Sequence, residues 1–309
     1  MSSWTLHDMP DLSGTTAVVT GANSGLGAVT ALTLARSGAR TVLACRSHEK
    51  GQRALEAVLR AAPRADARLV DLDLADLSSV ERAAEVITKE VGGRLDLLVN
   101  NAGVMAIPQL RTADGFEMQF GTNHLGHFAL TQRLLPVLGV EGPARVVTVS
   151  SIGHRIGRIA LDDLNSRRGY SRWGAYGQSK LANLLFTAEL DRRARASGRD
   201  LLALAAHPGL SSTELGQRGP LLSGHPWLAR LERLSRCYTQ PASAGALPTL
   251  YAATLADAPG GGFYGPGRLA ETRGAPAPAR RSARAEDVDT ARALWEESAR
   301  LTDLDPDLV

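Results

Sequence analysis

The chain has 309 residues, of which 44% are apolar and 5% aromatic, with 31 glycines. Its 35 basic and 32 acidic side chains give a formal net charge of +3, which argues against a nucleic-acid partner or an anionic membrane surface. The two cysteines, Cys45 and Cys237, are too far apart for a disulfide framework or a cysteine metal motif. The sequence also lacks a leader pattern and any apolar run as long as a membrane span. We therefore expect a cytoplasmic protein with no membrane segment.

Short apolar runs alternate with helical patterns along the chain. We predict strands at 16–20, 41–45, 67–73, 95–103, 144–150 and 201–209. We predict helices at about 25–36, 49–61, from Ser78 onward, 114–138, 174–197, and in the stretch AEDVDTARALWEESARL near the C-terminus. Apolar strands that alternate with helices indicate a parallel sheet covered on both faces. The expected fold is α/β: a doubly wound parallel sheet of the Rossmann type, with three αβα layers in a single domain.

Three segments of this domain have different expected tasks. Residues from about 14 to 209 should form the nucleotide-binding core. The segment 210–240, interrupted by Gly and Pro, should be irregular and cover the substrate. Residues 268–285 are rich in Ala, Pro and Arg and should form a mobile loop, so that about 268–309 make a C-terminal loop and helix. Ser78, with Glu81 three positions later, is the expected cap of its helix.

The stretch VVTGANSGLG places Gly21, Gly25 and Gly27 between the first strand and the first helix. A chain that turns sharply here and points helix N-terminal amides at a pyrophosphate needs glycine, because a side chain would block the approach. The spacing differs from the common G-x-G-x-x-G fingerprint, and the same pattern also fits a tight turn without a ligand. Taken alone, the turn favours a dinucleotide site only modestly.

The end of the second strand bears on the form of the dinucleotide. No Asp or Glu occurs from 41 to 48, where an acidic residue would bind a ribose 2′-hydroxyl and repel a 2′-phosphate. Arg46 lies there instead, with Lys50 beyond it, and a guanidinium can bind a phosphate through two hydrogen bonds. The alternative is a solvated arginine at a strand end. The charge pattern favours NADP(H) over NAD(H) and leaves open whether Lys50 joins Arg46.

The stretch GYSRWGAYGQSK contains two tyrosines that could act as a catalytic acid, Tyr170 and Tyr176. Tyr176 and Lys180 are four residues apart, so a helix over 174–197 places them on one face. A nearby cation favours the phenolate and lowers the pKa of a tyrosine. Tyr170 precedes the helix and has no such neighbour. Surface pairs with this spacing are common, and the spacing alone is therefore weak evidence for Tyr176. The preceding strand, which ends at Ser150 and Ser151, strengthens the preference for Tyr176 over Tyr170.

Four motifs in order, TGANSGLG, NNAG, YGQSK and HPG, resemble the short-chain dehydrogenase/reductases of classical type. The resemblance covers nearly the whole chain. The finer patterns ACRSHEKG, TNHLGHF, SKLANLLFTAEL and LWEESARL are similar to the retinol dehydrogenase and protochlorophyllide reductase-like branch of that family. The resemblance implies a Rossmann fold and an NADP(H)-dependent oxidoreductase.

The resemblance also implies roles for individual residues. Tyr176 would be the acid/base and Lys180 the cation that lowers its pKa and binds the nicotinamide ribose. Ser151 would hold the substrate carbonyl oxygen, with Ser150 as structural support, and Asn123 would kink its helix and support a proton relay through a water. The implied cofactor-binding residues are Gly21, Asn23, Ser24, Gly25, Leu26, Gly27, Arg46, Asp73, Leu74, Asn100, Ala102, Gly103, Tyr176, Lys180, Pro208, Gly209, Leu210 and Thr213.

Some of these residues have ordinary structural alternatives. A role as a turn or capping residue explains Asp73 nearly as well, and the alternative for Asn100 is turn formation at a strand end. His124 and His127 lie close together in TNHLGHF, but without a third ligand they are expected to serve in packing or an interface rather than bind a metal. No metal is expected anywhere in the chain.

The expected function is the interconversion of a small apolar carbonyl compound and its alcohol by hydride transfer with NADP(H). The apolar character of the substrate is inferred from side chains in the covering segment: Leu215, Leu221, Leu222, Trp227 and Leu228. One alternative is a tailoring ketoreductase for a polyketide-type metabolite. Another is a catalytically idle protein that senses NADP(H). Family members often pair through the helices near 114–138 and 174–197, so a homodimer or homotetramer is a further expectation.

Overall fold

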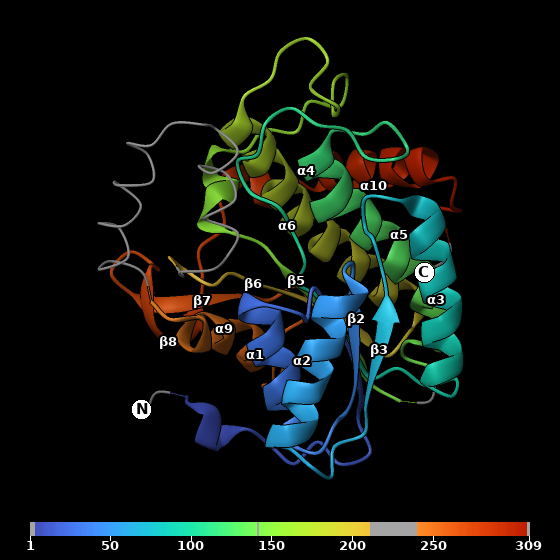
Figure 1. Ribbon diagram of the computed structural model, residues 1–309. Helices are drawn as coiled ribbons and strands as arrows, with labels where there is room; N and C mark the ends of the chain where they lie inside the picture. The colour runs from blue at the N-terminus through green and yellow to red at the C-terminus, as the bar shows by residue number, and fades with distance from the viewer. Residues whose placement is uncertain (1–3, 141, 211–239, 308–309) are drawn as a thin grey trace, which may run out of the picture.

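One eight-stranded sheet organises the computed structural model of the protein, which describes residues 4–140, 142–210 and 240–307 (Figure 1). The strands lie in the order β3-β2-β1-β4-β5-β6-β7-β8, and all pairs are parallel except β7 with β8. Their bounds are β1 Thr16–Thr20, β2 Arg40–Cys45, β3 Ala67–Asp71, β4 Leu97–Asn100, β5 Ala144–Val149, β6 Leu201–Ala206, β7 Phe263–Arg268 and β8 Arg273–Pro278. The order reverses between β1 and β4, where sheets of this kind bind ligands at their carboxyl edge.

Helices cover both faces of the sheet, as the alternation of the strands predicts. Their bounds are α1 Gly25–Arg36, α2 His48–Ala61, α3 Leu77–Glu90, α4 Met118–Phe120, η2 Gly121–Leu125, α5 Gly126–Leu134, η4 Ile152–Ile156, α6 Arg172–Ser197, α9 Ala242–Thr254 and α10 Val288–Thr302. Within β1, Ala17 and Val19 pack with α1 and α9, whereas Val18 packs with α3 and α5. The protein therefore has the predicted three αβα layers, with α1, α2 and α9 on one side (Figure 1).

Two predicted helices differ from their sequence patterns. Helix α3 begins at Leu77 rather than Ser78, because the Asp76 side chain accepts hydrogen bonds from the amides of Ser78 and Ser79. The helix predicted at 114–138 begins only at Met118, after Glu117, whose carboxylate caps it. The chain then becomes π-helical through η2 before α5 starts.

The segment predicted as a mobile loop, 268–285, is largely ordered secondary structure. Strand β8 pairs with β7 as an antiparallel edge hairpin, and a short 3-10 helix follows at Ala283–Glu286. The proline content misled the prediction, because proline is tolerated on an edge strand, where one side of the ladder needs no donor. The last helix, α10, is confirmed, and its Trp295 stacks on Phe186 of α6.

Candidate active site

The glycine turn after β1 leaves no room for side chains. Gly21 and Gly25 have φ angles of +65° and +54°, in the left-handed region that glycine tolerates. A Cβ on Gly27 would lie 2.4 Å from both the Gly21 carbonyl oxygen and Asn101 Nδ2. The turn therefore depends on glycine at the positions that the sequence singled out.

The N-terminus of α1, which follows this turn, has no side-chain cap. Ser24 occupies the N-cap position without a capping hydrogen bond, and the first turn carries no acidic residue. Side chains do cap α2, α3, α6 and α10. Uncapped amides and the helix dipole suit an anion, so the segment that carries Asn23 and Leu26 fits the pyrophosphate of a dinucleotide.

The loop after β4 is joined to the same turn. The Thr20 hydroxyl accepts hydrogen bonds from the amides of Asn101, at 2.9 Å, and Ala102, at 3.0 Å. Asn101 Nδ2 donates to the Thr20 carbonyl at 2.8 Å. Asn100 is fully buried, and its side chain donates to Thr131 of α5 at 3.0 Å. The turn and the loop thus form one wall, while the Asn100 side chain is engaged with the helix layer.

Charged residues cluster where β2 and β3 end. Arg46 is exposed directly after β2 and has no ion-pair partner within the described ranges. The acidic Asp71, which pairs with Cys45 across the strands, was missed by the sequence reasoning. His48 Nδ1 lies 2.9 Å from its carboxylate. Asp71, the acidic residue at the end of β3, therefore has His48 as its partner.

Asp73 and Leu74 lie in the turn after β3. Asp73 Oδ1 accepts a hydrogen bond from the Ala75 amide at 3.0 Å, so the turn-forming alternative for this aspartate is realised. Leu74 is buried, and a Cβ on Gly126 would lie 2.4 Å from its carbonyl oxygen. The turn therefore packs closely against the start of α5.

Ser151, Tyr176 and Lys180 meet at the carboxyl end of β5. A Cβ on Gly153 would lie 3.1 Å from Tyr176 Cε1 and 3.4 Å from Ser151 Oγ, so the phenol ring and the hydroxyl flank the same small space. Lys180 Nζ lies 5.9 Å from the centre of the Tyr176 ring and donates to the Val149 carbonyl at 3.0 Å. Helix α6 places Tyr176 and Lys180 one turn apart, as their spacing predicts.

Burial controls the electrostatics of this group. It raises the pKa of Tyr176 above the usual value, although the Ser151 side chain lowers it in part. Burial also lowers the pKa of Lys180 to about 8. The lowering of the Tyr176 pKa by Lys180 stays a prediction from their spacing.

Asn123 lies in the middle of the π-helical segment η2 and faces the same site. Its side chain accepts from the Val104 amide at 2.7 Å and donates to the Val104 carbonyl at 2.9 Å. It also donates to Ser179 Oγ at 2.9 Å, and Ser179 in turn donates to the Tyr176 carbonyl at 2.8 Å. Ser179 was not predicted, because nothing in the local sequence distinguishes it from an ordinary helix serine.

Tyr170 is held in a structural role. Its hydroxyl donates to the Ile107 carbonyl at 2.9 Å and accepts from Gln119 Nε2 at 2.9 Å. Burial, followed by the charge of Glu117, raises the pKa of Tyr170 to about 12. A phenol with these partners and this pKa is poorly suited to proton transfer, which leaves Tyr176 as the candidate acid.

The HPG segment follows β6 and contacts the β7–β8 hairpin. Gly209 has a φ of +65°, and a Cβ there would lie 2.5 Å from the Thr272 carbonyl oxygen. The Leu210 amide donates to the same oxygen at 3.1 Å, and the Pro208 carbonyl accepts from Gln240 Nε2 at 2.7 Å. The remaining predicted residues of this region lie outside the described residues: Thr213, Leu215, Leu221, Leu222, Trp227 and Leu228.

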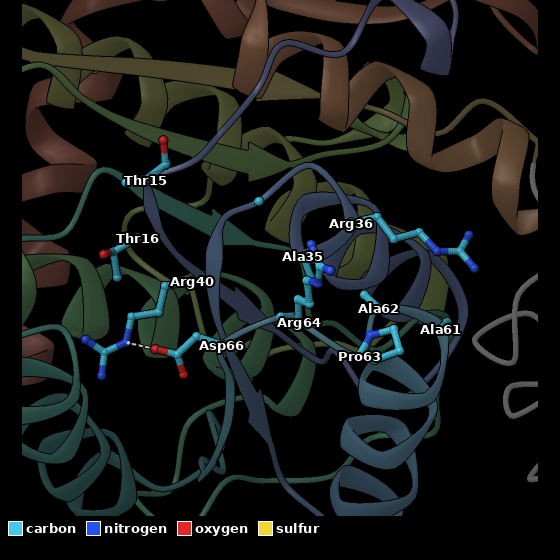
Figure 2. A pocket seen from close by; sticks show the side chains of 13 residues that line it. Thr15, Thr16, Ala35, Arg36, Arg40, Ala61, Ala62, Pro63, Arg64 and Asp66 are labelled. Atoms are coloured by element: carbon cyan, nitrogen blue, oxygen red, sulfur yellow. Dashed lines mark ion pairs between the residues drawn. The ribbon is translucent and has the colours of Figure 1, made fainter.

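A cavity of about 650 Å³ lies at the opposite edge of the sheet (Figure 2). Thr16 and Arg40, the first residues of β1 and β2, line it, and Figure 2 shows the ion pair of Arg40 with Asp66. None of the predicted site residues lines this cavity. Ligands of doubly wound sheets bind at the carboxyl ends of the strands, so the candidate active site is the edge that carries the glycine turn.

The part of the chain that the structure describes lacks two features. Within it, no three His, Cys, Asp or Glu side chains are grouped so that they could hold a metal ion. Also within it, no helix has both the length and the apolar character needed to cross a membrane.

The sheet order, the glycine turn and the Ser151–Tyr176–Lys180 group define a nicotinamide-dependent oxidoreductase of the Rossmann type. Comparison with known proteins agrees, because the short chain dehydrogenase family model matches residues 15–219, and the chain belongs to that family. Human retinol dehydrogenase 13 is 44% identical over 94% of this chain and 86% of its own length. The chain is therefore a member of the retinol dehydrogenase-like branch.

Solved structures give the same fold. A crystal structure of an uncharacterised protein from Mycobacterium paratuberculosis has a TM-score of 0.81 and 47% identity, covering 98% of this chain and 99% of that one. A short chain dehydrogenase from Shigella flexneri, solved with NADP, has a TM-score of 0.61 at 23% identity, covering 80% of this chain and 94% of that one. The second likeness concerns the fold alone.

Proposed function

We propose that the protein interconverts an apolar aldehyde or ketone and the corresponding alcohol, with NADP(H) as the hydride donor or acceptor. The observation that carries this proposal is the meeting of Ser151, Tyr176 and Lys180 around one small space beside the glycine turn. The relatives in the retinol dehydrogenase branch make retinal and retinol the first pair to test.

A dinucleotide bound beside the glycine turn would supply or accept the hydride at the substrate carbon. Ser151 Oγ holds the carbonyl oxygen, and the Tyr176 phenol donates its proton to that oxygen as the alkoxide forms. The charged form of Lys180 stabilises the phenolate that remains and binds the nicotinamide ribose. Asn123 supports the return of a proton to Tyr176 through a water.

Each part of the dinucleotide would have its own set of residues. The uncapped amides after Gly25 would hold the pyrophosphate, Asp73 and Leu74 would border the adenine, and Asn100 to Gly103 would follow the ribose edge. The segment from Pro208 to Thr213, whose last residues lie outside the described ranges, would hold the carboxamide. Arg46 would hold the 2′-phosphate, and its exposed guanidinium supports NADP(H) over NAD(H).

Exposed apolar side chains near Tyr176 support an apolar substrate. Trp173 is 55% exposed, and its ring lies edge-on to the Tyr176 ring at 6.0 Å. Ile156 is 61% exposed and lies beside Gly177, the residue after Tyr176. Apolar groups that remain in water next to a reactive phenol suit a substrate that covers them.

The Tyr176→Phe variant tests the proposal. Removal of the phenol hydroxyl should abolish NADPH-dependent reduction of retinal or another apolar carbonyl, whereas binding of NADPH, measured by fluorescence titration, should persist. Tyr170→Phe is the matched control, because Tyr170 is a half-buried phenol in the same stretch of sequence, and its hydroxyl bonds to the Ile107 carbonyl and to Gln119. It should lower stability and keep turnover.

Two results would contradict the proposed chemistry. Full activity in Tyr176→Phe would remove that residue from the reaction. NADPH binding by the wild-type protein without turnover on aldehydes, aliphatic ketones or polycyclic ketones would instead favour a dinucleotide-sensing protein. Turnover limited to polycyclic ketones would favour the tailoring ketoreductase.

A further inference from the structure

Two histidines in TNHLGHF have the same burial and different surroundings. His124 and His127 are each 1% exposed. His124 Nε2 lies 2.9 Å from Ser298 Oγ of α10, and its ring packs on Phe120 and Phe186. His124 therefore belongs to the packing of the C-terminal helix, whereas His127 reaches the active site.

His127 joins the dinucleotide wall to Asn123. Its Nε2 lies 2.9 Å from Thr20 Oγ1, and its Nδ1 lies 3.0 Å from the Asn123 carbonyl oxygen. Thr20 Oγ1 also accepts the amides of Asn101 and Ala102, the hydrogen bonds that hold the loop after β4 to the glycine turn. One imidazole thus contacts both the group that shapes the cofactor wall and a residue of the proton-transfer site.

The hydrogen-bonding pattern fixes the tautomer of His127. Two amides use both acceptor positions of the Thr20 hydroxyl, so this hydroxyl donates to His127 Nε2 rather than accepting from it. The Val99 carbonyl, at 3.4 Å, is the more distant acceptor for the same proton. The imidazole proton then lies on Nδ1 and is donated to the Asn123 carbonyl. Burial lowers the pKa of His127 to about 4, which keeps the ring neutral at ordinary pH.

The connection continues to the catalytic helix. The Asn123 side chain donates to Ser179, and Ser179 donates to the Tyr176 carbonyl. Hydrogen bonds, joined through the covalent structure of Asn123, therefore link Thr20 and His127 to Ser179 and to the backbone carbonyl of Tyr176. These contacts connect β1, α5, η2 and α6, elements that come from different parts of the sequence.

We propose that His127 is a positioning residue that couples the dinucleotide-binding turn to the proton-transfer side of the active site, through Thr20 on one side and the Asn123 carbonyl on the other. The connection through the Asn123 carbonyl, which affects proton transfer, rests on the proposed function. The connection through Thr20 affects dinucleotide binding and depends only on the geometry of Thr20 and of the loop that carries Asn101 and Ala102.

Three substitutions of His127 separate the two connections. In His127→Asn the side-chain amide can replace Nδ1 as the donor to Asn123, and in His127→Gln it can replace Nε2 as the acceptor from Thr20. His127→Phe keeps the ring and loses both. We expect His127→Phe to lower kcat and weaken NADPH binding, each by about tenfold, because the Thr20 hydroxyl loses its nearer acceptor and the Asn123 carbonyl loses the imidazole donor. His127→Asn should mainly weaken NADPH binding, and His127→Gln should mainly lower kcat.

His124→Phe is the matched control, since it removes an equally buried histidine from the same helical segment. It should lower the melting temperature as His127→Phe does, and leave kcat and the Kd for NADPH within about twofold of wild type. Equal kinetic effects of the two Phe variants, or wild-type kcat and Kd in His127→Phe, would overturn the proposal.

The two readouts also separate this inference from the proposed function. If the wild-type protein binds a dinucleotide without turning over a carbonyl, the proposed function fails, while the Kd comparison still decides the connection through Thr20. That comparison is made with NADPH, or with NADH if wild type binds NADH more tightly. An unchanged Kd in both His127→Phe and His127→Asn would then overturn the coupling.

Discussion

Lys180 is a buried ionisable residue, and the burial of its ammonium group lowers the free energy of unfolding. Its side chain is enclosed by α6, β5 and the loop at Gly103, and its Nζ has a hydrogen bond to Val149. Burial lowers the pKa of Lys180 from 10.5 to about 8, so the folded protein disfavours the ammonium. Proteins commonly keep such unfavourable groups only where function needs them.

The pH dependence of stability follows from this shift. The unfolded chain holds the Lys180 proton up to about pH 10.5, whereas the folded protein releases it near pH 8. Between these values the unfolded state binds more protons, so the contribution of this group to the free energy of unfolding rises with pH. Below pH 8 the full penalty applies, which is about 3 kcal/mol at about 1.4 kcal/mol per pKa unit.

Lys180→Met should therefore be more stable than wild type at pH 7, by up to about 3 kcal/mol, and should lose turnover. The gain should shrink as the pH rises from 8 to 10, which urea denaturation at both pH values can measure. Lys89→Met is the control, because it removes the same charge from an exposed position on α3 rather than from a buried one. A variant less stable than wild type at pH 7 would contradict the assigned burial penalty.

Individual site residues differed in how well the sequence predicted them. Tyr176 and Lys180 share one helix, so their spacing alone placed them on one face. Ser179 and Asp71 were missed, and His127 was expected only in packing or an interface, because they have partners 23 to 107 positions away in the sequence. Contacts of this kind depend on how strands and helices from distant parts of the chain are brought together.

The β7–β8 hairpin braces the active site from outside. Its turn contains three consecutive residues in the left-handed region, Leu269, Ala270 and Glu271. Glu271 lies 2.6 Å from Arg155 of η4 and 3.4 Å from His207, and it accepts the Arg280 amide at 3.0 Å. These contacts connect the strained turn to the segment that follows Ser151 and to the start of HPG.

Glu271→Ala should loosen both active-site segments at once. We expect a higher KM for the carbonyl substrate and a fall of about tenfold in kcat/KM, because small displacements at a reacting centre are costly. Steady-state kinetics with a melting curve can check this. Glu297→Ala is the control, because it breaks a surface ion pair with Arg300 on α10. It should lower the free energy of unfolding by at most about 1 kcal/mol and leave the kinetics unchanged. Unchanged KM and kcat in Glu271→Ala would contradict a bracing role.

At the level of elements, the sequence predicted those with a clear period and missed those that depend on neighbours. The apolar strands and α1 lie where predicted, because burial on both faces requires continuous apolar runs. The π-helical segment η2 was not predictable from local propensity, since Asn123 engages Val104 and Ser179 across the fold. Helix α9 was likewise not predicted, and it carries Pro248 within it.

Across the whole molecule, the carboxyl edge of the sheet gathers the candidate site from six strand ends. In the proposed function the turns after β1, β2, β3, β4 and β6 bind the dinucleotide, and the turn after β5 carries Ser151. The crossovers of a doubly wound sheet bring these ends together, so binding at this edge should stabilise the whole fold. Stability therefore reports dinucleotide preference without requiring a substrate.

The preference for NADP(H) can be measured in this way. A ligand at a concentration 100 times its Kd stabilises the folded state by about 2.7 kcal/mol, so NADPH should raise the melting temperature more than NADH at equal concentration. Arg46→Glu should remove that advantage, because a carboxylate repels the 2′-phosphate that the guanidinium would bind. Lys50→Glu, tested separately, shows whether the second cation takes part, and Arg53→Ala on the same helix α2 is the control. A larger shift of the melting temperature with NADH than with NADPH in wild type would show a preference for NAD(H). An unchanged NADPH shift in Arg46→Glu would show that other residues hold the 2′-phosphate.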